Sequence, residues 1–419
     1  MEFRCEGARV ACEFDHHSPE FAENYRAMLD ELREAAPVVW SEAYGGFWIA
    51  TRHDVVRRLA KDATALTVDP GADRTGGLRI PTPPGLKNRP LLAPGEIDGV
   101  EHDQYRAALN PHFSKQRMQQ LVPMIQRHVD ATVDRILELG RFDVIDDVAS
   151  PILCAVTCEH LGLEVDDPVG LFAAMMDMIS YVPREDSAIA ESYDAVAANF
   201  NKHWHLVLDT IEARAREPRD DVISHLLRWE NPRFSDHQVQ MMALNVILGA
   251  SHTTKSLIAQ AVAYLAEHDD ERRRLVAEPE LMRQAVNEFL RLFTVAVGLC
   301  RTATRDIEVG EVTIRAGDRL LLGYASANHD PDKYPNPGVF DLARGSAQHL
   351  ALGVGSHFCL GAWMANYIAA ATLQALVTRV PDLVVDTARV VTAHDKSTHN
   401  AFESMPAATA AALLQPSLA

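Results

Sequence analysis

The chain has 419 residues, of which 47% are hydrophobic and 23% are charged, which is typical of a folded globular protein with ample core. Its formal net charge of −18 argues against nucleic-acid binding, because phosphate contacts need clustered lysine and arginine. Six scattered cysteines do not resemble a disulfide framework, so we expect a reducing, cytoplasmic environment. No apolar run is long enough for a signal peptide or a membrane anchor.

The N-terminal quarter predicts a helix, two short strands and a second helix. Ser18 is a good N-cap for a helix that begins with a proline. Residues 38–40 and 46–51 have the composition of strands around a turn, and another helix follows from about Asp54. Residues 69–95 are crowded with proline and glycine, which fits either an interdomain linker or a functional loop.

Helical segments dominate the middle of the chain. The sequence predicts helices over about 118–139, 150–161, 169–181 and 191–216. From Asp236 to about His268, Gly249 is the one proline or glycine in a strongly apolar pattern that follows the N-cap Ser235. This pattern predicts one helix roughly 50 Å long, which must cross the whole domain.

A glycine-rich stretch, residues 349–365, surrounds a single cysteine. Gly353, Gly355 and Gly361 tolerate left-handed backbone angles and allow close approach to a flat ligand. Helix-forming residues follow, so Cys359 is expected where a loop enters a helix, and there amide groups and the helix dipole favour a thiolate. A thiolate held in this way suits a soft metal. The alternative is an ordinary buried cysteine beside a turn.

The whole stretch resembles the haem-binding signature of the cytochrome P450 superfamily, Phe-Gly-x-Gly-x-His-x-Cys-x-Gly. One position departs from it, since Leu352 replaces the aromatic residue that shields the cysteine. The matching residues are Gly353, Gly355, His357, Cys359 and Gly361.

The resemblance covers about residues 15–410 and implies the fold. It is the mainly α cytochrome P450 fold, a large helical domain with a long central helix and small β-sheets. We expect a single domain over residues 1–419, with a flexible N-terminus over residues 1–15.

The resemblance also implies the residues that hold the cofactor, haem b (protoporphyrin IX iron). Cys359 would be the axial ligand of the iron. His102 and Arg106, four residues apart in a predicted helix, match a pair that binds haem propionates. Arg301 matches a strand residue that reaches a propionate, and His357 would also contact the haem. Without the resemblance, His102 and Arg106 would be read as a solvated helix face.

Residues 249–254 match the family's oxygen-side motif, Ala/Gly-Gly-x-Asp/Glu-Thr-Thr, so Gly249 and Ala250 would lie beside the haem. Thr253 matches the threonine that helps deliver protons, although its hydroxyl could simply bond to the carbonyl one turn earlier. His252 replaces the acid, and either relays protons or packs as a neutral histidine. Ala250 replaces the second glycine and could narrow the oxygen pocket.

Glu288 and Arg291, three residues apart in a predicted helix, match the family's Glu-x-x-Arg pair, and Arg344 matches its third member. The pattern itself is common, but this copy lies about 70 residues before the cysteine, as the family requires. We expect this triad to fix the cysteine loop. Further on, His329 replaces the arginine of the family's Ala-Asn-Arg-Asp-Pro motif.

The family's substrate-contact segments fall on the proline-rich loop 69–95 and on residues 172–182, 294–297 and 397–402. The apolar candidates are Leu78, Ile80, Leu86, Leu91, Val295, Val297 and Phe402.

The resemblance implies a haem-thiolate monooxygenase that activates O2 to hydroxylate a small hydrophobic organic substrate. The chain has no flavin or Rossmann fingerprint and no cluster-type cysteine run. Electrons from NAD(P)H would therefore arrive through a separate ferredoxin and its reductase. Two alternatives stay open. The first is a peroxide-driven or radical-coupling enzyme, which the loss of the acid at His252 favours, and the second is a non-catalytic haem-binding protein.

Overall fold

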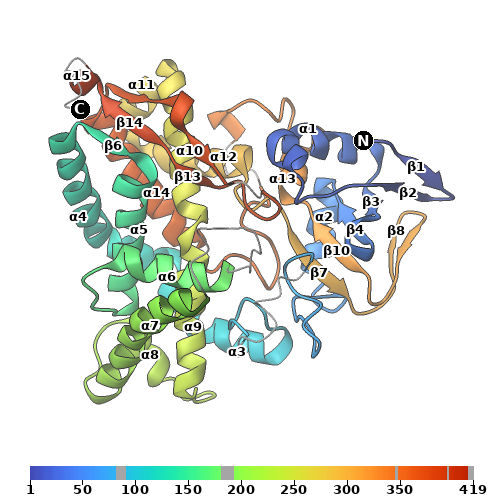
Figure 1. The fold of residues 1–419 in the computed structure, drawn as a ribbon, viewed down its shortest axis with the longest axis horizontal. Coiled ribbons are helices and arrows are strands. Elements are labelled where there is room, and N and C mark those ends of the chain that lie inside the picture. The colour runs from blue at the N-terminus through green and yellow to red at the C-terminus, as the bar shows by residue number, and fades with distance from the viewer. Residues whose placement is uncertain (82–90, 181–192, 345–347, 394–395, 414–419) are drawn as a thin grey trace.

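The computed structural model describes residues 1–81, 91–180, 193–344, 348–393 and 396–413. Most helices gather on one side of the molecule, and the largest sheet lies on the other with α1 and α2 beside it (Figure 1). This arrangement confirms the predicted mainly α fold with small sheets. Within the described part of the chain, every helix is too short or too polar to cross a membrane.

The helices begin and end close to the predicted positions. Ser18 caps α1, since its hydroxyl accepts a hydrogen bond from the Phe21 amide at 3.0 Å. In chain order the helices are α1 Pro19–Ala35, α2 His53–Lys61, α3 Gly99–Leu109, α4 Lys115–Leu139, α5 Ser150–Leu161, α6 Pro168–Ser180, α7 Tyr193–Arg216, α8 Val222–Leu227, α9 Asp236–Ser251, α10 Thr253–Glu267, α11 Asp269–Ala277, α12 Met282–Phe293, α13 Tyr324–Ala327, α14 Ala362–Arg379 and α15 Ala410–Leu413.

The main sheet has the strand order β1-β2-β3-β4-β10-β7-β5, and three small sheets have the orders β11-β14-β6, β12-β13 and β8-β9. In the main sheet, β10 pairs parallel with β4 and antiparallel with β7. The strands are β1 Arg4–Glu6, β2 Arg9–Cys12, β3 Val38–Ser41, β4 Phe47–Ala50, β5 Leu66–Thr67, β6 Arg141–Asp143, β7 Leu299–Ala303, β8 Ile307–Val309, β9 Val312–Ile314, β10 Arg319–Leu322, β11 Leu383–Val385, β12 Val391–Thr392, β13 Phe402–Ser404 and β14 Pro406–Thr409.

The N-terminus is part of the main sheet. β1 and β2 form a hairpin, and β2 pairs parallel with β3 through Ala11 and Trp40. Cys12 is fully buried in the core formed by α1 and the sheet. Part of the segment expected to be flexible, residues 4–6 and 9–12, is therefore paired in the sheet, although the residues of β1 are exposed.

The predicted central helix is present but broken. α9 ends at Ser251, α10 begins at Thr253, and His252 between them has φ −116° and ψ −37°. The hydroxyls of Ser251 and Thr253 donate to the carbonyls of Ile247 at 2.7 Å and Gly249 at 3.3 Å. Such side-chain bonds compete with the backbone ladder and bend helices, so the expectation of one uninterrupted helix is wrong at its middle.

The proline-rich loop after β5 is attached to the main sheet, which argues against an interdomain linker. The Arg319 guanidinium donates to the carbonyls of Gly77 at 2.8 Å and Arg79 at 2.9 Å, and the Cys300 amide donates to the Leu78 carbonyl at 3.0 Å. Arg319 and Cys300 lie on the neighbouring strands β10 and β7. The strands β7 and β10 therefore fix the start of the proline-rich loop.

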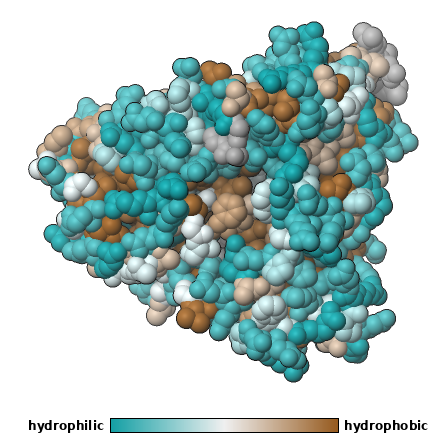
Figure 2. All heavy atoms as spheres, turned by 180° about the vertical axis from the view of Figure 1, so that it is seen from behind, coloured by the Kyte–Doolittle hydropathy of each residue, from teal (hydrophilic) through white to brown (hydrophobic). Residues whose placement is uncertain are grey.

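Most of the surface in Figure 2 is hydrophilic, and the hydrophobic residues on that face gather in a few areas. The large apolar side chains are instead concentrated in three buried clusters, and the largest of these joins α4, α5, α9, α10, α12 and α14. α14 packs against α4, α10 and α12. The helix that follows Cys359 is therefore held on several sides.

Candidate active site around Cys359

Cys359 lies at the end of a tight loop that leads into α14. Gly353 and Gly355 have φ of +67° and +85°, where glycine is strongly favoured. A Cβ on Gly355 would lie 2.8 Å from the Ala60 carbonyl oxygen, so this residue also allows close packing on the end of α2. The Cys359 amide donates to the Leu352 carbonyl at 2.9 Å, which closes the loop.

Gly361 does not adopt the left-handed backbone angle that we predicted for it. Its φ is −81°, so no left-handed angle requires glycine here. It is the cap residue of α14, and a Cβ added to it would meet no atom within 4 Å. Gly361 therefore leaves space beside the cysteine, as close approach of a flat ligand demands.

The protein groups around Cys359 do not by themselves favour the thiolate. Burial raises the pKa of the Cys359 thiol, and the hydrogen bond from the Gly361 amide and the charge of Arg106 lower it by less. The favourable amide group at the start of α14 is therefore outweighed by burial. A bound metal ion deprotonates a coordinating thiol outright, so this sulfur fits iron ligation better than free thiol chemistry.

Four predicted propionate contacts come from three separate parts of the chain. The His102 and His357 rings lie with centroids 4.5 Å apart, which joins α3 to the cysteine loop. Arg106 lies one turn after His102, close enough for its charge to act on Cys359. Arg301 is 7% exposed on β7.

The two arginines are the test of whether the residues present fit haem. The Arg301 guanidinium donates to the Cys300 carbonyl at 2.7 Å, and neither arginine has a carboxylate partner among the described residues. A buried cation without a counter-charge is costly. Two propionates beside Cys359 would supply that charge, so the site fits an iron porphyrin.

Asp98 is a site residue that the sequence analysis missed. Its carboxylate lies 2.7 Å from His357 Nε2 and accepts hydrogen bonds from the Thr67 hydroxyl at 2.5 Å and the Val68 amide at 2.7 Å. Burial raises the pKa of Asp98, but these donors outweigh burial and bring it to about 2. Asp98 thus connects the cysteine loop to the start of the proline-rich loop. A lone aspartate before α3 carries no recognisable motif.

Glu288 and Arg291 form a buried ion pair, with Nη2 of Arg291 2.7 Å from Oε1 of Glu288. Arg291 also donates to the carbonyls of Asn328 at 3.0 Å and Pro337 at 2.7 Å. Arg344 Nε lies 3.2 Å from Glu288 Oε1 but is not aligned for a hydrogen bond, so this contact is an ion pair alone.

The triad reaches the cysteine loop indirectly, through Asn328. The Asn328 side chain accepts a hydrogen bond from the Leu350 amide at 2.7 Å, and Leu350 begins the loop. His329, the next residue, is contacted by Arg26 from α1. Burial, and then the charge of Arg26, lower the pKa of His329 to about 3. A guanidinium from the N-terminal helix thus contacts the histidine that replaces the family's arginine.

Residues 249–254, the oxygen-side motif, combine an uncrowded glycine with polar side chains. A Cβ on Gly249 would meet no atom within 4 Å, so no protein group packs closely there. The Thr253 hydroxyl makes the bond to the carbonyl one turn earlier that we named as the alternative. Burial, and then the charges of Lys255 and Arg79, lower the pKa of His252 to about 4. His252 is therefore neutral at neutral pH.

The predicted substrate residues divide between two hydrophobic clusters. Val295 is buried in the large helical cluster, against which Phe402 packs. Val297 and Ile80 are buried together with residues of α1. Leu78 is half-buried, and Leu86 lies outside the described residues.

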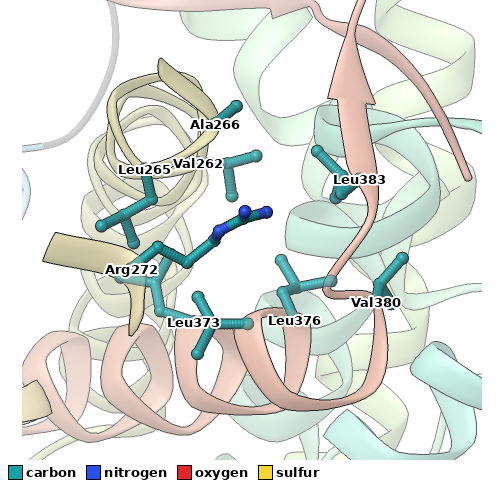
Figure 3. A pocket seen from close by; sticks show the side chains of 9 residues that line it. Val262, Leu265, Ala266, Arg272, Leu373, Leu376, Val380 and Leu383 are labelled. Atoms are coloured by element: carbon teal, nitrogen blue, oxygen red, sulfur yellow. The ribbon is translucent and has the colours of Figure 1, made fainter. Parts of the chain in front are cut away.

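A cavity of about 20 Å³ lies between the ends of α10 and α14, where Leu265, Leu373 and Val380 line it beside Arg272 (Figure 3). It has room for about one water molecule. Its α14 residues lie in the C-terminal half of that helix, whereas Cys359 precedes the N-terminus. This cavity is therefore separate from the candidate active site.

Comparison with known proteins identifies the family. A family model described as cytochrome P450 matches residues 97–380. A steroid C26-monooxygenase of Mycolicibacterium smegmatis is 30% identical over 315 residues, which cover 74% of this chain and 76% of the relative. The 6-deoxyerythronolide B hydroxylase of Saccharopolyspora erythraea is 28% identical over 378 residues, which cover 88% of this chain and 92% of the relative.

The fold agrees with these relatives. The crystal structure of epothilone D-bound cytochrome P450epoK superimposes with a TM-score of 0.81 at 25% identity, covering 95% of this chain and 99% of that one. The chain belongs to the cytochrome P450 family. It is a P450 monooxygenase of the bacterial type, with haem as cofactor and O2 as co-substrate.

Proposed function

We propose that this P450 is a single-domain enzyme, residues 1–419, that hydroxylates a small hydrophobic organic substrate with electrons from a ferredoxin and its reductase. The observation that carries the proposal concerns two arginines, Arg106, whose charge acts on Cys359, and the buried Arg301 of β7. Among the described residues, neither of them has a carboxylate partner. Haem, when bound, supplies the oxygen-activating chemistry at its iron. The protein supplies the ligand, the proton path and the pocket.

The chain's own residues have separate tasks in binding haem. Cys359 would ligate the iron, and Leu352 would lie beside that ligand in place of the family's aromatic residue. Arg106 and Arg301 would neutralise the propionates. His102 and His357 would lie beside them, with His357 held by the Asp98 carboxylate. The glycines of the loop, Gly353, Gly355 and Gly361, shape it and leave space for the ring.

On the opposite side, Thr253 and His252 would hold and move protons. The Thr253 hydroxyl donates to the Gly249 carbonyl, which leaves its oxygen lone pairs free to order a water. Because its pKa is about 4, His252 would pass protons as a neutral imidazole, accepting at one ring nitrogen and donating at the other. Ala250 adds a methyl group beside this path.

An exposed aromatic and basic patch supports a separate electron donor. Phe358 is 39% exposed and precedes Cys359 directly, and Trp363 on α14 is 38% exposed. The Lys115 ammonium and the Arg283 guanidinium lie 5.5 and 5.8 Å from the Trp363 ring. Aromatic residues with arginine are typical of protein interfaces. We propose that an acidic ferredoxin docks here, where the path to the iron ligand is short.

The test combines a spectrum with turnover. The parent protein should show a red-shifted Soret band for its reduced carbon monoxide complex, and Cys359→Ser should abolish that band. A screen of terpenoid, steroid, fatty acid, aromatic and polyketide compounds should find a ferric spin-state shift, with NADH use matched to hydroxylated product when ferredoxin and reductase are added. An unchanged spectrum in the variant would remove Cys359 as the ligand.

A peroxide-driven or radical-coupling reaction is the second candidate, because His252 replaces the acid of the proton relay. If His252 relays protons, His252→Ala should raise uncoupled peroxide release during ferredoxin-driven turnover. Unaltered coupling, together with hydrogen peroxide supporting the same rate as reduced ferredoxin, would favour the second candidate instead.

A further inference from the structure

Two segments predicted to contact substrate lie side by side in the structure. The Val297 amide donates to the Thr398 carbonyl, and the Asn400 amide donates to the Val295 carbonyl, both at 2.8 Å. The segment before β7 and the segment before β13 are therefore joined into one unit by backbone hydrogen bonds. What this unit is attached to decides the shape of the pocket on that side.

A reciprocal pair of buried amides attaches the unit to α10. Gln260 Nε2 donates to the Asn400 carbonyl at 3.1 Å, and Asn400 Nδ2 donates to Gln260 Oε1 at 3.2 Å. Asn400 Nδ2 also donates to the Tyr25 hydroxyl on α1 at 2.9 Å. The backbone carbonyl can only accept, which fixes the orientation of both amides. Gln260 and Asn400 are 5% and 6% exposed.

The attachment lies on the same face of α10 as Thr253. Ser256 and Gln260 follow Thr253 by three and seven residues, so the three side chains lie on one face of the helix. The Ser256 hydroxyl accepts a hydrogen bond from the Phe402 amide at 3.3 Å. At 1.5 Å per residue, these two contacts lie about 4.5 and 10 Å from Thr253 along the helix axis.

We propose that Gln260 and Asn400 are positioning residues. They would hold the unit formed by the segments before β7 and β13, which is the substrate-side wall of the pocket, at a set distance from α10. In this way they would decide which substrates fit. A buried amide that loses its partner must move to find another. Breaking this pair would release the wall, while the haem-binding residues keep all their contacts. The inference rests on the proposed function, because it takes this wall to face the substrate.

The experiment compares a small and a bulky azole that both bind the ferric haem iron. In Gln260→Leu and Asn400→Leu we expect the Kd of 4-phenylimidazole to change by about 10-fold, within the range that pocket shape gives for small apolar groups. The Kd of imidazole, which occupies the iron site alone, should change by less than about 2-fold. The double variant should shift no further than the single variants, because both break one pair.

Two further variants separate positioning from loss of stability. Asn366→Leu removes another buried amide, which accepts a hydrogen bond from the Arg283 guanidinium of α12 at 2.9 Å. This change should lower the melting temperature without changing the ratio of the two Kd values. Ser256→Ala breaks only the bond to Phe402 and should shift the same ratio in a protein that folds.

An unchanged ratio in Gln260→Leu, Asn400→Leu and Ser256→Ala, or an equal shift for both azoles, would overturn the proposal. The reduced carbon monoxide spectrum of the parent protein is recorded first. Absence of the red-shifted Soret band in that spectrum would refute the proposed function. An unchanged ratio of the two Kd values together with a normal spectrum would refute this inference alone.

Discussion

Replacing Glu288 tests the buried ion pair that supports the cysteine loop. Arg291 is fully buried and Glu288 is 2% exposed. In Glu288→Gln, Arg291 keeps its three backbone carbonyl partners, Asn328, Pro337 and Val339, but loses its counter-charge. Removing one partner of a buried pair costs about 3–5 kcal/mol, which is a large part of a typical stability of about 5–15 kcal/mol.

This cost can be converted to a melting temperature. At about 2.1 cal/mol/K per residue, 419 residues give an unfolding entropy of about 0.9 kcal/mol/K, so the midpoint should fall by about 3–6 °C. Thermal unfolding of the haem-loaded protein, followed by circular dichroism and by the Soret band, measures the change. Haem should be lost at a lower temperature, since Asn328 links the pair to the loop.

The control is a pair with the same three-residue spacing at the surface. Arg273 and Asp270 lie 3.1 Å apart, with the Asp270 side chain fully exposed, and exposed pairs contribute little. Asp270→Asn should therefore melt with the parent protein. If Glu288→Gln also melts with Asp270→Asn, the buried pair does not stabilise the fold and the reasoning fails.

Two other predictions concern acid and haem retention. Burial, and then the charge of His112, lower the pKa of His160 to about 4 from its ordinary 6.5, so the unfolded chain takes up the proton first. Stability should then fall as the pH drops from 6.5 to 4, by at most about 3 kcal/mol from this group. Urea titrations at several pH values give the free energy of unfolding as a function of pH. In His160→Gln the slope of this function should correspond to about one proton fewer taken up on unfolding. An unchanged slope would contradict the assignment. Asp98→Asn weakens the support of His357, and should speed haem transfer to apomyoglobin by about 10-fold, whereas a rate equal to that of Asp270→Asn would show that Asp98 does not position the haem contacts.

Local signals explain what could be predicted. The N-cap Ser18 and the left-handed glycines at 353 and 355 act within a few residues of themselves, so the sequence pattern around them is enough. The signature around Cys359 is of the same kind, and it led to the family. Thr253 shows the limit of this approach. The same motif fitted a hydroxyl that helps deliver protons and a hydroxyl that bonds to the carbonyl one turn earlier.

The features that the sequence did not indicate depend on contacts and backbone angles that exist only in the folded chain. Nothing in residues 1–15 shows that a partner strand, β3, lies beside them. The break at His252 depends on where the hydroxyls of Ser251 and Thr253 point, which helix propensity does not report. The role of Gly361 depended on its φ, which composition cannot supply.

The sequence by itself determined the helical fold and the family, because these depend on residues close together in the chain. Only the tertiary structure decided how distant residues meet. It places Arg26 on His329, Asp98 on His357 and Gln260 on Asn400, pairs separated by 303, 259 and 140 residues. No periodicity or motif links such positions, since their contact exists only after the helices and sheets have packed.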